Sequence, residues 1–109
     1  MPPERWTVRL AAAAEADFAA ILEWTLERFG TGQAAGYETV LREAVKALGD
    51  GPAIPGVSRR EDIGPGLCVL HVARNGNRGR HFLLFRVADA QTLDILRILH
   101  DSMELPRHL

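Results

Sequence analysis

The chain has 109 residues, of which 47% are hydrophobic and 25% are charged, values ordinary for a globular fold. We therefore expect a single domain over residues 1–109. Proteins that bind nucleic acids through phosphates usually carry an overall basic excess, and the formal net charge of −1 shows none here. Residues 1–50 carry five basic and eight acidic side chains, and residues 51–109 carry eight and six, so any anion-binding face must be local.

The composition also narrows the cellular setting. The single cysteine, Cys68, excludes an intrachain disulfide framework and a multi-cysteine zinc site, and its place in an apolar run indicates a core filler. Residues 1–5 lead into no continuous apolar stretch, and no segment approaches 18 uninterrupted apolar residues. We expect a cytoplasmic protein with no signal peptide and no membrane contact.

A short strand followed by two helices is expected in the first half. Residues 6–10 (WTVRL) alternate apolar and polar side chains, the period of a half-buried strand. From Ala12 onward an apolar stripe recurs at helical spacing: Phe18, Ile21, Leu22, Thr25 and Phe29. Gly30 is placed to end this helix, and a second stripe follows it: Tyr37, Val40, Leu41, Ala44 and Leu48. So short a joint predicts an antiparallel helix hairpin.

The second half of the chain is typical of strands. Residues 53–66 are too rich in glycine, proline and charge for regular structure. Apolar runs predict buried strands at 67–73 and 81–87, joined by a loop, RNGNRGR, that contains Asn-Gly and a second glycine. Residues 92–99 fit a strand or a helix. Because they follow two strands after a tight turn, we interpret them as a third strand, which ends near His100.

The expected order is therefore β-α-α-β-β-β, with strands segregated from helices. This order is typical of the α+β class. We expect two layers, in which an N-terminal strand and an α-helical hairpin pack on an antiparallel β-sheet. The other face of the sheet, or the groove beside the hairpin, is left for water or a partner.

Several segments, taken in order, carry a family resemblance. Gly79-Arg80-His81 leads into Phe85-Arg86-Val87, and Leu96-Arg97-Ile98-Leu99-His100 is followed by Met103 and then Pro106-Arg107-His108-Leu109. In this order and spacing, over nearly its whole length, the chain resembles the ParE branch of the RelE/ParE superfamily. Members of this superfamily are the toxin halves of bacterial toxin–antitoxin pairs.

The resemblance implies a RelE/ParE-like fold and a toxin of a type II toxin–antitoxin or plasmid stabilization system. It implies growth inhibition through binding and poisoning of DNA gyrase, without a catalytic site. It also implies a ParD-like antitoxin, whose C-terminal segment wraps the toxin while its N-terminal ribbon-helix-helix part dimerises and binds the operator. This chain would then reach operator DNA only through the antitoxin, and we expect no cofactor.

RelE-like relatives instead cleave mRNA on the ribosome, which leaves a second function open. Such cleavage needs a base, an acid and cations for the phosphorane, and these relatives draw them from Lys, Arg and Tyr. Here the only lysine and tyrosine lie on the second predicted helix, and Phe85 stands where relatives often carry Tyr. The residues that could supply this chemistry are Arg80, His81, Arg97 and His100, with His108 and Arg86 as further candidates. Because histidines on separate elements seldom converge, we favour the gyrase-binding function. A third alternative is a non-toxic member that acts only as antitoxin partner and co-repressor.

The binding residues that we expect are few. Trp24 lies off the helical stripe and is either a flank of the core or an exposed anchor for the antitoxin, and we favour the anchor. Arg86 and Arg97 point away from their apolar neighbours and either bind antitoxin carboxylates or are solvated or paired, Arg86 with Asp94 for example. The expected contacts with the cellular target are His100, Arg107 and His108.

Other chemistry finds little support in the sequence. His71 and His81 lie in or beside apolar strands, where a hydrogen-bonded structural histidine is the commoner outcome. The loop RNGNRGR does not join a strand to a helix, so it does not match a phosphate-binding loop. No His-x₃-His pair or carboxylate cluster occurs, and we expect no metal.

Overall fold

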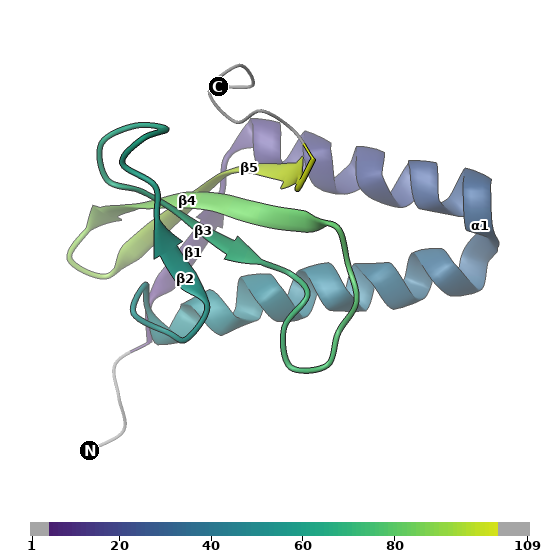
Figure 1. The fold of residues 1–109 in the computed structure, drawn as a ribbon, viewed down its shortest axis with the longest axis horizontal. Coiled ribbons are helices and arrows are strands. Elements are labelled where there is room, and N and C mark those ends of the chain that lie inside the picture. Colours follow the sequence, from purple (N-terminus) through teal and green to yellow (C-terminus); the bar gives the residue numbers. More distant parts are fainter. Residues whose placement is uncertain (1–4, 103–109) are drawn as a thin grey trace.

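Residues 5–102, which the computed structural model describes, form a long bent helix and a five-stranded sheet (Figure 1). The elements in chain order are β1 (Thr7–Leu10), α1 (Ala12–Ala47), a 3₁₀ turn η1 (Leu48–Asp50), β2 (Val57–Arg59), β3 (Leu67–His71), β4 (His81–Asp89) and β5 (Thr92–His100). The α+β class and the two layers expected from the sequence are confirmed. No helix in this part of the chain is both long and apolar enough to cross a membrane.

The helix α1 is a hairpin of two arms, as predicted. Gly30 interrupts it with φ 87° and ψ 178°, a conformation essentially restricted to glycine. The first arm (residues 12–29) and the second arm (residues 31–47) lie side by side and run in opposite directions, and both reach well beyond the sheet (Figure 1).

The sheet has the order β1-β5-β4-β3-β2, and it is mixed rather than antiparallel. β1 pairs with β5 in parallel, from Thr7 opposite Thr92 to Leu10 opposite Ile95, and the other pairs are antiparallel. The prediction of a purely antiparallel sheet was wrong in this detail. The hairpin and three strands lie between β1 and β5 in the chain, so a long connection joins them and parallel pairing is possible. The prediction of an irregular connector missed β2, whose three residues are too few to show a period.

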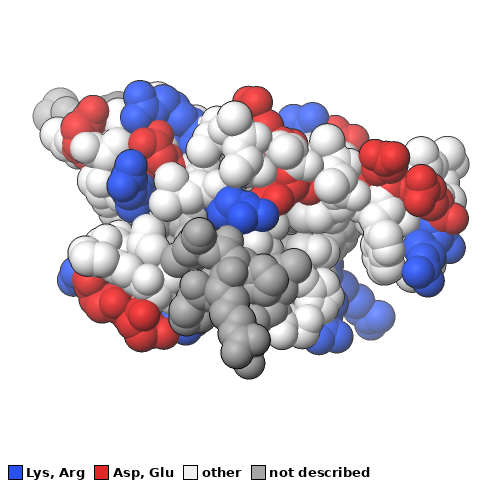
Figure 2. Space-filling model, turned by 90° about the horizontal axis from the view of Figure 1, so that it is seen from above, with Lys and Arg blue, Asp and Glu red and all other residues white. Residues whose placement is uncertain are grey.

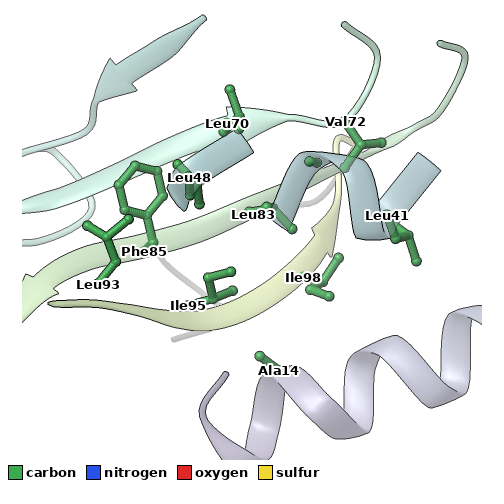
Figure 3. Packing of buried hydrophobic residues seen from close by; sticks show 11 residues of the cluster. Ala14, Leu41, Leu48, Leu70, Val72, Leu83, Phe85, Leu93, Ile95 and Ile98 are labelled. Carbon is green, nitrogen blue, oxygen red and sulfur yellow. The ribbon is translucent and has the colours of Figure 1, made fainter. Parts of the chain in front are cut away.

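The main core lies between the hairpin and one face of the sheet. Figure 3 shows Leu83 and Phe85 from β4 and Ile95 and Ile98 from β5 packed against both arms, with Ala14 on the first. Both predicted stripes contribute, with one exception. Phe29 is 61% exposed, because it lies at the bend where the arms extend beyond the sheet.

A smaller apolar cluster lies on the opposite face of the sheet. Its buried members are Leu67, Phe82, Leu84 and Leu99, and no residue of α1 belongs to it. Phe82 and Leu84 alternate along β4 with the two core residues Leu83 and Phe85, as the pleat requires. Cys68 packs against the main core, and burial raises the pKa of its thiol, which agrees with the predicted filler role.

Candidate functional site

A cavity of about 870 Å³ opens between the two arms of α1 and the end of the sheet where β5 finishes and β4 begins. Its arm side carries mostly apolar and small residues (Ala20, Ile21, Trp24, Phe29, Gly32, Gly36 and Val40), with four polar ones among them: Asp17, Thr25, Gln33 and Tyr37. Its sheet side carries polar and cationic residues: Arg78, Arg80, His81, Arg97 and His100. We call this hollow the cleft. A large apolar hollow with a few polar groups at one end is the usual form of a binding site.

Two histidines from adjacent strands line the sheet end of the cleft, and a third lies nearby. His81 on β4 lies directly opposite His100 on β5, and the two rings meet edge to face with centroids 5.2 Å apart. His71 ends β3 nearby, and its Nε2 lies 3.0 Å from Oδ2 of Asp101. The expectation that scattered histidines seldom converge was therefore wrong for His81 and His100, because strand register brings them together.

Asp101 connects His71 and Arg80 at this end. It accepts hydrogen bonds from His71 Nε2 and from Arg80 Nε, the latter at 3.1 Å. These bonds, first that of His71 and then that of Arg80, hold the pKa of the Asp101 carboxyl below its usual range. The carboxylate therefore stays ionised and orients Arg80 beside the cleft.

Tyr37 is the residue of this cluster that the sequence reasoning missed as a site residue. Its hydroxyl lies 2.6 Å from Nδ1 of His81 and accepts the backbone N–H of Arg80 at 3.2 Å. With the hydroxyl assigned as the donor to Nδ1, the neutral His81 ring carries its proton on Nε2. The signal was available, because a tyrosine within a core stripe needs a partner for its hydroxyl when buried.

Burial keeps both members of this pair neutral. Burial, with the neighbouring His100 as a smaller cause, lowers the pKa of His81 from 6.5 to about 4. Burial also raises the pKa of Tyr37 above 10. At neutral pH the pair is thus a fixed, uncharged hydrogen bond between the second arm and β4.

Arg97 is held by the first arm. Its guanidinium forms a two-pronged pair with Asp17, at 2.8 Å and 3.0 Å, and Asp17 also accepts the backbone N–H of Ile98 at 2.9 Å. The predicted alternative in which Arg97 is paired within the fold is therefore the one observed. The pair raises the pKa of Arg97, so the side chain remains cationic at the wall of the cleft.

The far end of the cleft, near the bend of α1, exposes aromatic rings. Trp24 is 51% exposed and stacks edge to face on Phe29, with ring centroids 5.7 Å apart. The guanidinium of Arg28 lies 5.4 Å from the centroid of Trp24. Trp24 thus lies outside the core. This position is the one expected of an anchor for a partner.

Arg86 lies away from the cleft. It is exposed on β4 opposite Asp94, and Asp94 is bonded to Arg9 at 2.7 Å. Arg9 and, more weakly, Arg86 lower the pKa of Asp94. The structure therefore separates Arg86 from Trp24 and Arg97, with which the sequence reasoning grouped it.

Two predicted target contacts, Arg107 and His108, lie outside the described residues. The third, His100, lies in the cleft, where its Nδ1 is 2.7 Å from Oγ of Ser102. Within residues 5–102 no group of three or more His, Cys, Asp or Glu side chains is arranged to hold a metal ion. On the face seen in Figure 2, acidic and basic side chains are interspersed rather than gathered into a field of one sign.

Comparison with known proteins agrees with this geometry. Residues 8–105 match the family described as the ParE toxin of the type II toxin–antitoxin system parDE. The chain is 35% identical over 101 residues to the protein named Toxin ParE1 from two strains of Mycobacterium tuberculosis. The aligned region covers 92% of this chain and 94% of that protein.

Solved structures with the same fold come from toxin–antitoxin systems. One, from the chromosomal ParDE system of P. aeruginosa, has a TM-score of 0.68 and 26% identity, covering 87% of this chain and 95% of that one. Another, from the RelBE2 toxin–antitoxin complex of Mycobacterium tuberculosis, has a TM-score of 0.55 and 25% identity, covering 88% and 98%. The fold and the family match together define a toxin of a type II toxin–antitoxin system, and the chain belongs to the ParE toxin family.

Proposed function

We propose that this toxin arrests bacterial growth by binding and poisoning DNA gyrase, and that a ParD-like antitoxin neutralises it by occupying the cleft. The observation that carries the proposal is the match to the ParE family over residues 8–105. Operator DNA would be contacted through the antitoxin, in agreement with the net charge of −1. The act of this protein would be recognition in the cytoplasm and not bond cleavage.

The cleft supports the antitoxin part of the proposal. Exposed aromatic rings at one end and arginines at the other suit a segment that is apolar along most of its length and acidic at one end. Trp24 would be the main anchor, at the bend end of the cleft. Arg97 would contribute its charge from the wall, and Arg86 would contact antitoxin beyond the cleft.

The part of the toxin that meets gyrase is proposed from the sequence. We assign it to His100 and to the C-terminal residues Arg107 and His108. The test compares the toxicity of His100→Ala and Arg107→Ala with that of the parent chain, and antitoxin affinity is measured for each variant as the control. Retained toxicity in both variants would show that His100 and Arg107 do not contact the target.

A second function is favoured by one specific observation. The cluster of Tyr37, His81, His100 and Arg80 places two imidazoles, a phenol and a guanidinium at one end of the cleft, the residue types that RNA cleavage uses. We nevertheless rank mRNA cleavage second, because Nδ1 of His81 is occupied by the Tyr37 hydroxyl and the guanidinium of Arg97 by Asp17.

Expression of the chain in cells that lack the antitoxin separates the alternatives. A gyrase poison stops DNA synthesis and induces the DNA-damage response before protein synthesis falls. Rapid mRNA cleavage with halted translation, abolished by His100→Ala, would instead establish the ribonuclease. Unimpaired growth with soluble toxin present would support the third alternative, a partner and co-repressor without toxicity.

A further inference from the structure

Two glycines on the second arm of α1 have no explanation within the toxin itself. Gly36 lies inside the second arm, where glycine is a poorer helix former than alanine, and Gly32 lies in the first turn of that arm. Neither has a positive φ, and a Cβ added at either would meet no atom within 4 Å. By contrast, a Cβ at Gly79 would lie 2.9 Å from the Tyr37 hydroxyl, so the packing of the toxin accounts for that glycine.

Both glycines face the cleft, and they mark its middle. They are four residues apart, so they share one side of the second arm. Phe29 lies beyond Gly32 toward the bend, and Tyr37, next to Gly36, contacts the backbone of Arg80 at the sheet end. From the bend to the sheet the cleft thus passes from exposed aromatic rings to a stretch where the two glycines leave the helix backbone uncovered beside Gln33, and then to Arg78 and Arg80.

The order of these surfaces along the cleft indicates the shape and charge of a partner that would fill it. A bare helix surface lets a second backbone approach more closely than side chains would allow, as at helix crossings built on small residues. The aromatic rings offer apolar contact at one end, and the two arginines complement a carboxylate at the other.

We propose that Gly32 and Gly36 set the approach distance and the specificity of the cleft for its partner. The occupant is an amphipathic α-helix of the antitoxin, which crosses the second arm at these glycines. It places apolar side chains on Trp24 and Phe29 and an acidic side chain beside Arg78 and Arg80. This inference rests on the proposed antitoxin binding and adds which residues decide the fit.

The test adds single side chains to the bare surface and measures two quantities separately. Gly32→Ala, Gly36→Ala and Gly36→Leu are compared with the parent chain for unfolding midpoint and for affinity toward the purified antitoxin encoded by the adjacent gene. We expect the two alanine variants to keep or raise the midpoint and to lose about tenfold or more in affinity, because a well-packed contact tolerates added volume poorly. Gly36→Leu should lose more.

The matched control is Ala35→Leu, which adds bulk on the same arm at an exposed position outside the cleft and should leave affinity unchanged. Arg78→Glu should also weaken binding about tenfold or more, through repulsion of the acidic end. Full affinity in Gly32→Ala and Gly36→Leu overturns the role of the glycines, and full affinity in Arg78→Glu overturns the placement of the acidic end. If the parent chain itself does not bind the antitoxin, the proposed function fails, and this inference fails with it.

Discussion

At the scale of single residues, the toxin holds a neutral histidine where a charged one would be expected to help a cation-rich site. His81 is kept uncharged by burial and by the neighbouring His100, and its Nδ1 accepts the Tyr37 hydroxyl. The permanent charge at this end comes instead from Arg80, which Asp101 orients, and from Arg97, which Asp17 holds. An acidic group bound at this end would therefore meet the charge of arginine rather than that of His81.

The lowered pKa of His81 predicts acid-sensitive stability. In the unfolded chain this imidazole titrates near 6.5, and in the fold near 4, so the unfolded state takes up the proton first. The contribution of His81 is therefore fully present above pH 6.5 and is lost as the pH falls toward 4. Linkage between these two pKa values gives about 2–3 kcal/mol between pH 7 and pH 4.5. Because His81 is only partly buried, solvent screening should reduce this loss in the free energy of unfolding to about 1–2 kcal/mol. Urea unfolding at pH 7 and pH 4.5 measures this difference in the free energy of unfolding.

The control for this prediction is His81→Gln, which removes the titrating ring and should flatten the pH dependence between 6.5 and 4.5. An NMR titration that places the His81 pKa at its ordinary value would contradict the account. Tyr37→Phe removes the hydroxyl without removing the histidine. That variant should lose about 1–2 kcal/mol at pH 7, because it leaves Nδ1 of His81 without its donor.

At the scale of the elements, two features decide where the helix hairpin lies. Gly30 makes the bend, and Asp17 attaches the first arm to β5 beyond the point where β1 ends at Leu10. Past that point no strand lies on the β1 side of Ile98, and the Asp17 carboxylate accepts its N–H in place of a strand carbonyl. Beside the cleft, the arm is therefore joined to β5 by a side chain and not by a continued strand.

Asp17→Ala should cost about 2–3 kcal/mol, because it leaves the half-buried Arg97 guanidinium and the Ile98 N–H without their acceptor. Chemical unfolding followed by circular dichroism gives the value. The matched control is Asp94→Ala, which breaks a two-pronged pair of similar geometry with the exposed Arg9. Solvent screens that pair, so its loss should matter much less. Equal effects of the two substitutions would contradict a special role for Asp17.

Gly30→Ala tests the bend. The conformation at φ 87° and ψ 178° is strained for any residue with a Cβ, so this substitution should cost about 1–3 kcal/mol although the space around Gly30 is open. Gly36→Ala is the comparison, because the same methyl group in regular helix should raise the free energy of unfolding by up to about 1 kcal/mol. Thermal unfolding of the two variants should therefore shift in opposite directions, and a shift in the same direction would show that the bend is relaxed.

At the scale of the whole molecule, the toxin is a two-layer protein whose helix layer reaches beyond its sheet (Figure 1). The overhang leaves Trp24, Leu26 and Phe29 exposed at 51%, 45% and 61%. Exposed apolar side chains grouped at one end mark an interaction site. The free toxin therefore carries a surface that a partner is expected to cover, and binding should stabilise it.

Antitoxin binding should be visible in Trp24. In the variant Trp6→Phe, which leaves one tryptophan, we expect the emission to shift to shorter wavelength as the ring is removed from water. The free energy of unfolding should rise by about 2.7 kcal/mol at a free antitoxin concentration 100 times the Kd. The variant Trp24→Phe keeps Trp6 and serves as the control for changes elsewhere. An unshifted spectrum at saturating antitoxin would place the binding surface away from the bend.

Much of the fold could be predicted because it follows from local patterns of apolar and polar residues. The apolar stripe from Tyr37 to Leu48 and the runs in β3 and β4 have the periods of their elements, and each period defines which face is buried. Patterns fail where the signal is short or the outcome depends on distant segments. The three residues of β2 show no period, and the exposure of Phe29 depends on how far the sheet extends beneath the arm.

The site was less predictable than the fold, for a related reason. Arg97 and His100 were recognised by residue type, but whether they act alone or in pairs depends on strand register and on the position of α1. Asp17 and Tyr37 were not recognised as site residues, since both sit in a helical pattern that explains them without any partner 80 or 44 residues away.

The sequence by itself determined the family, the α+β class, the hairpin and the identity of most strands, because these depend on periodicity, on turn residues and on motifs in a fixed order. Only the tertiary structure decided that β1 runs parallel to β5, that Asp17 holds Arg97, that Tyr37 and His100 meet His81, and that Gly32 and Gly36 face an open cleft. Each of these depends on distances between segments far apart in the chain, which no local pattern encodes.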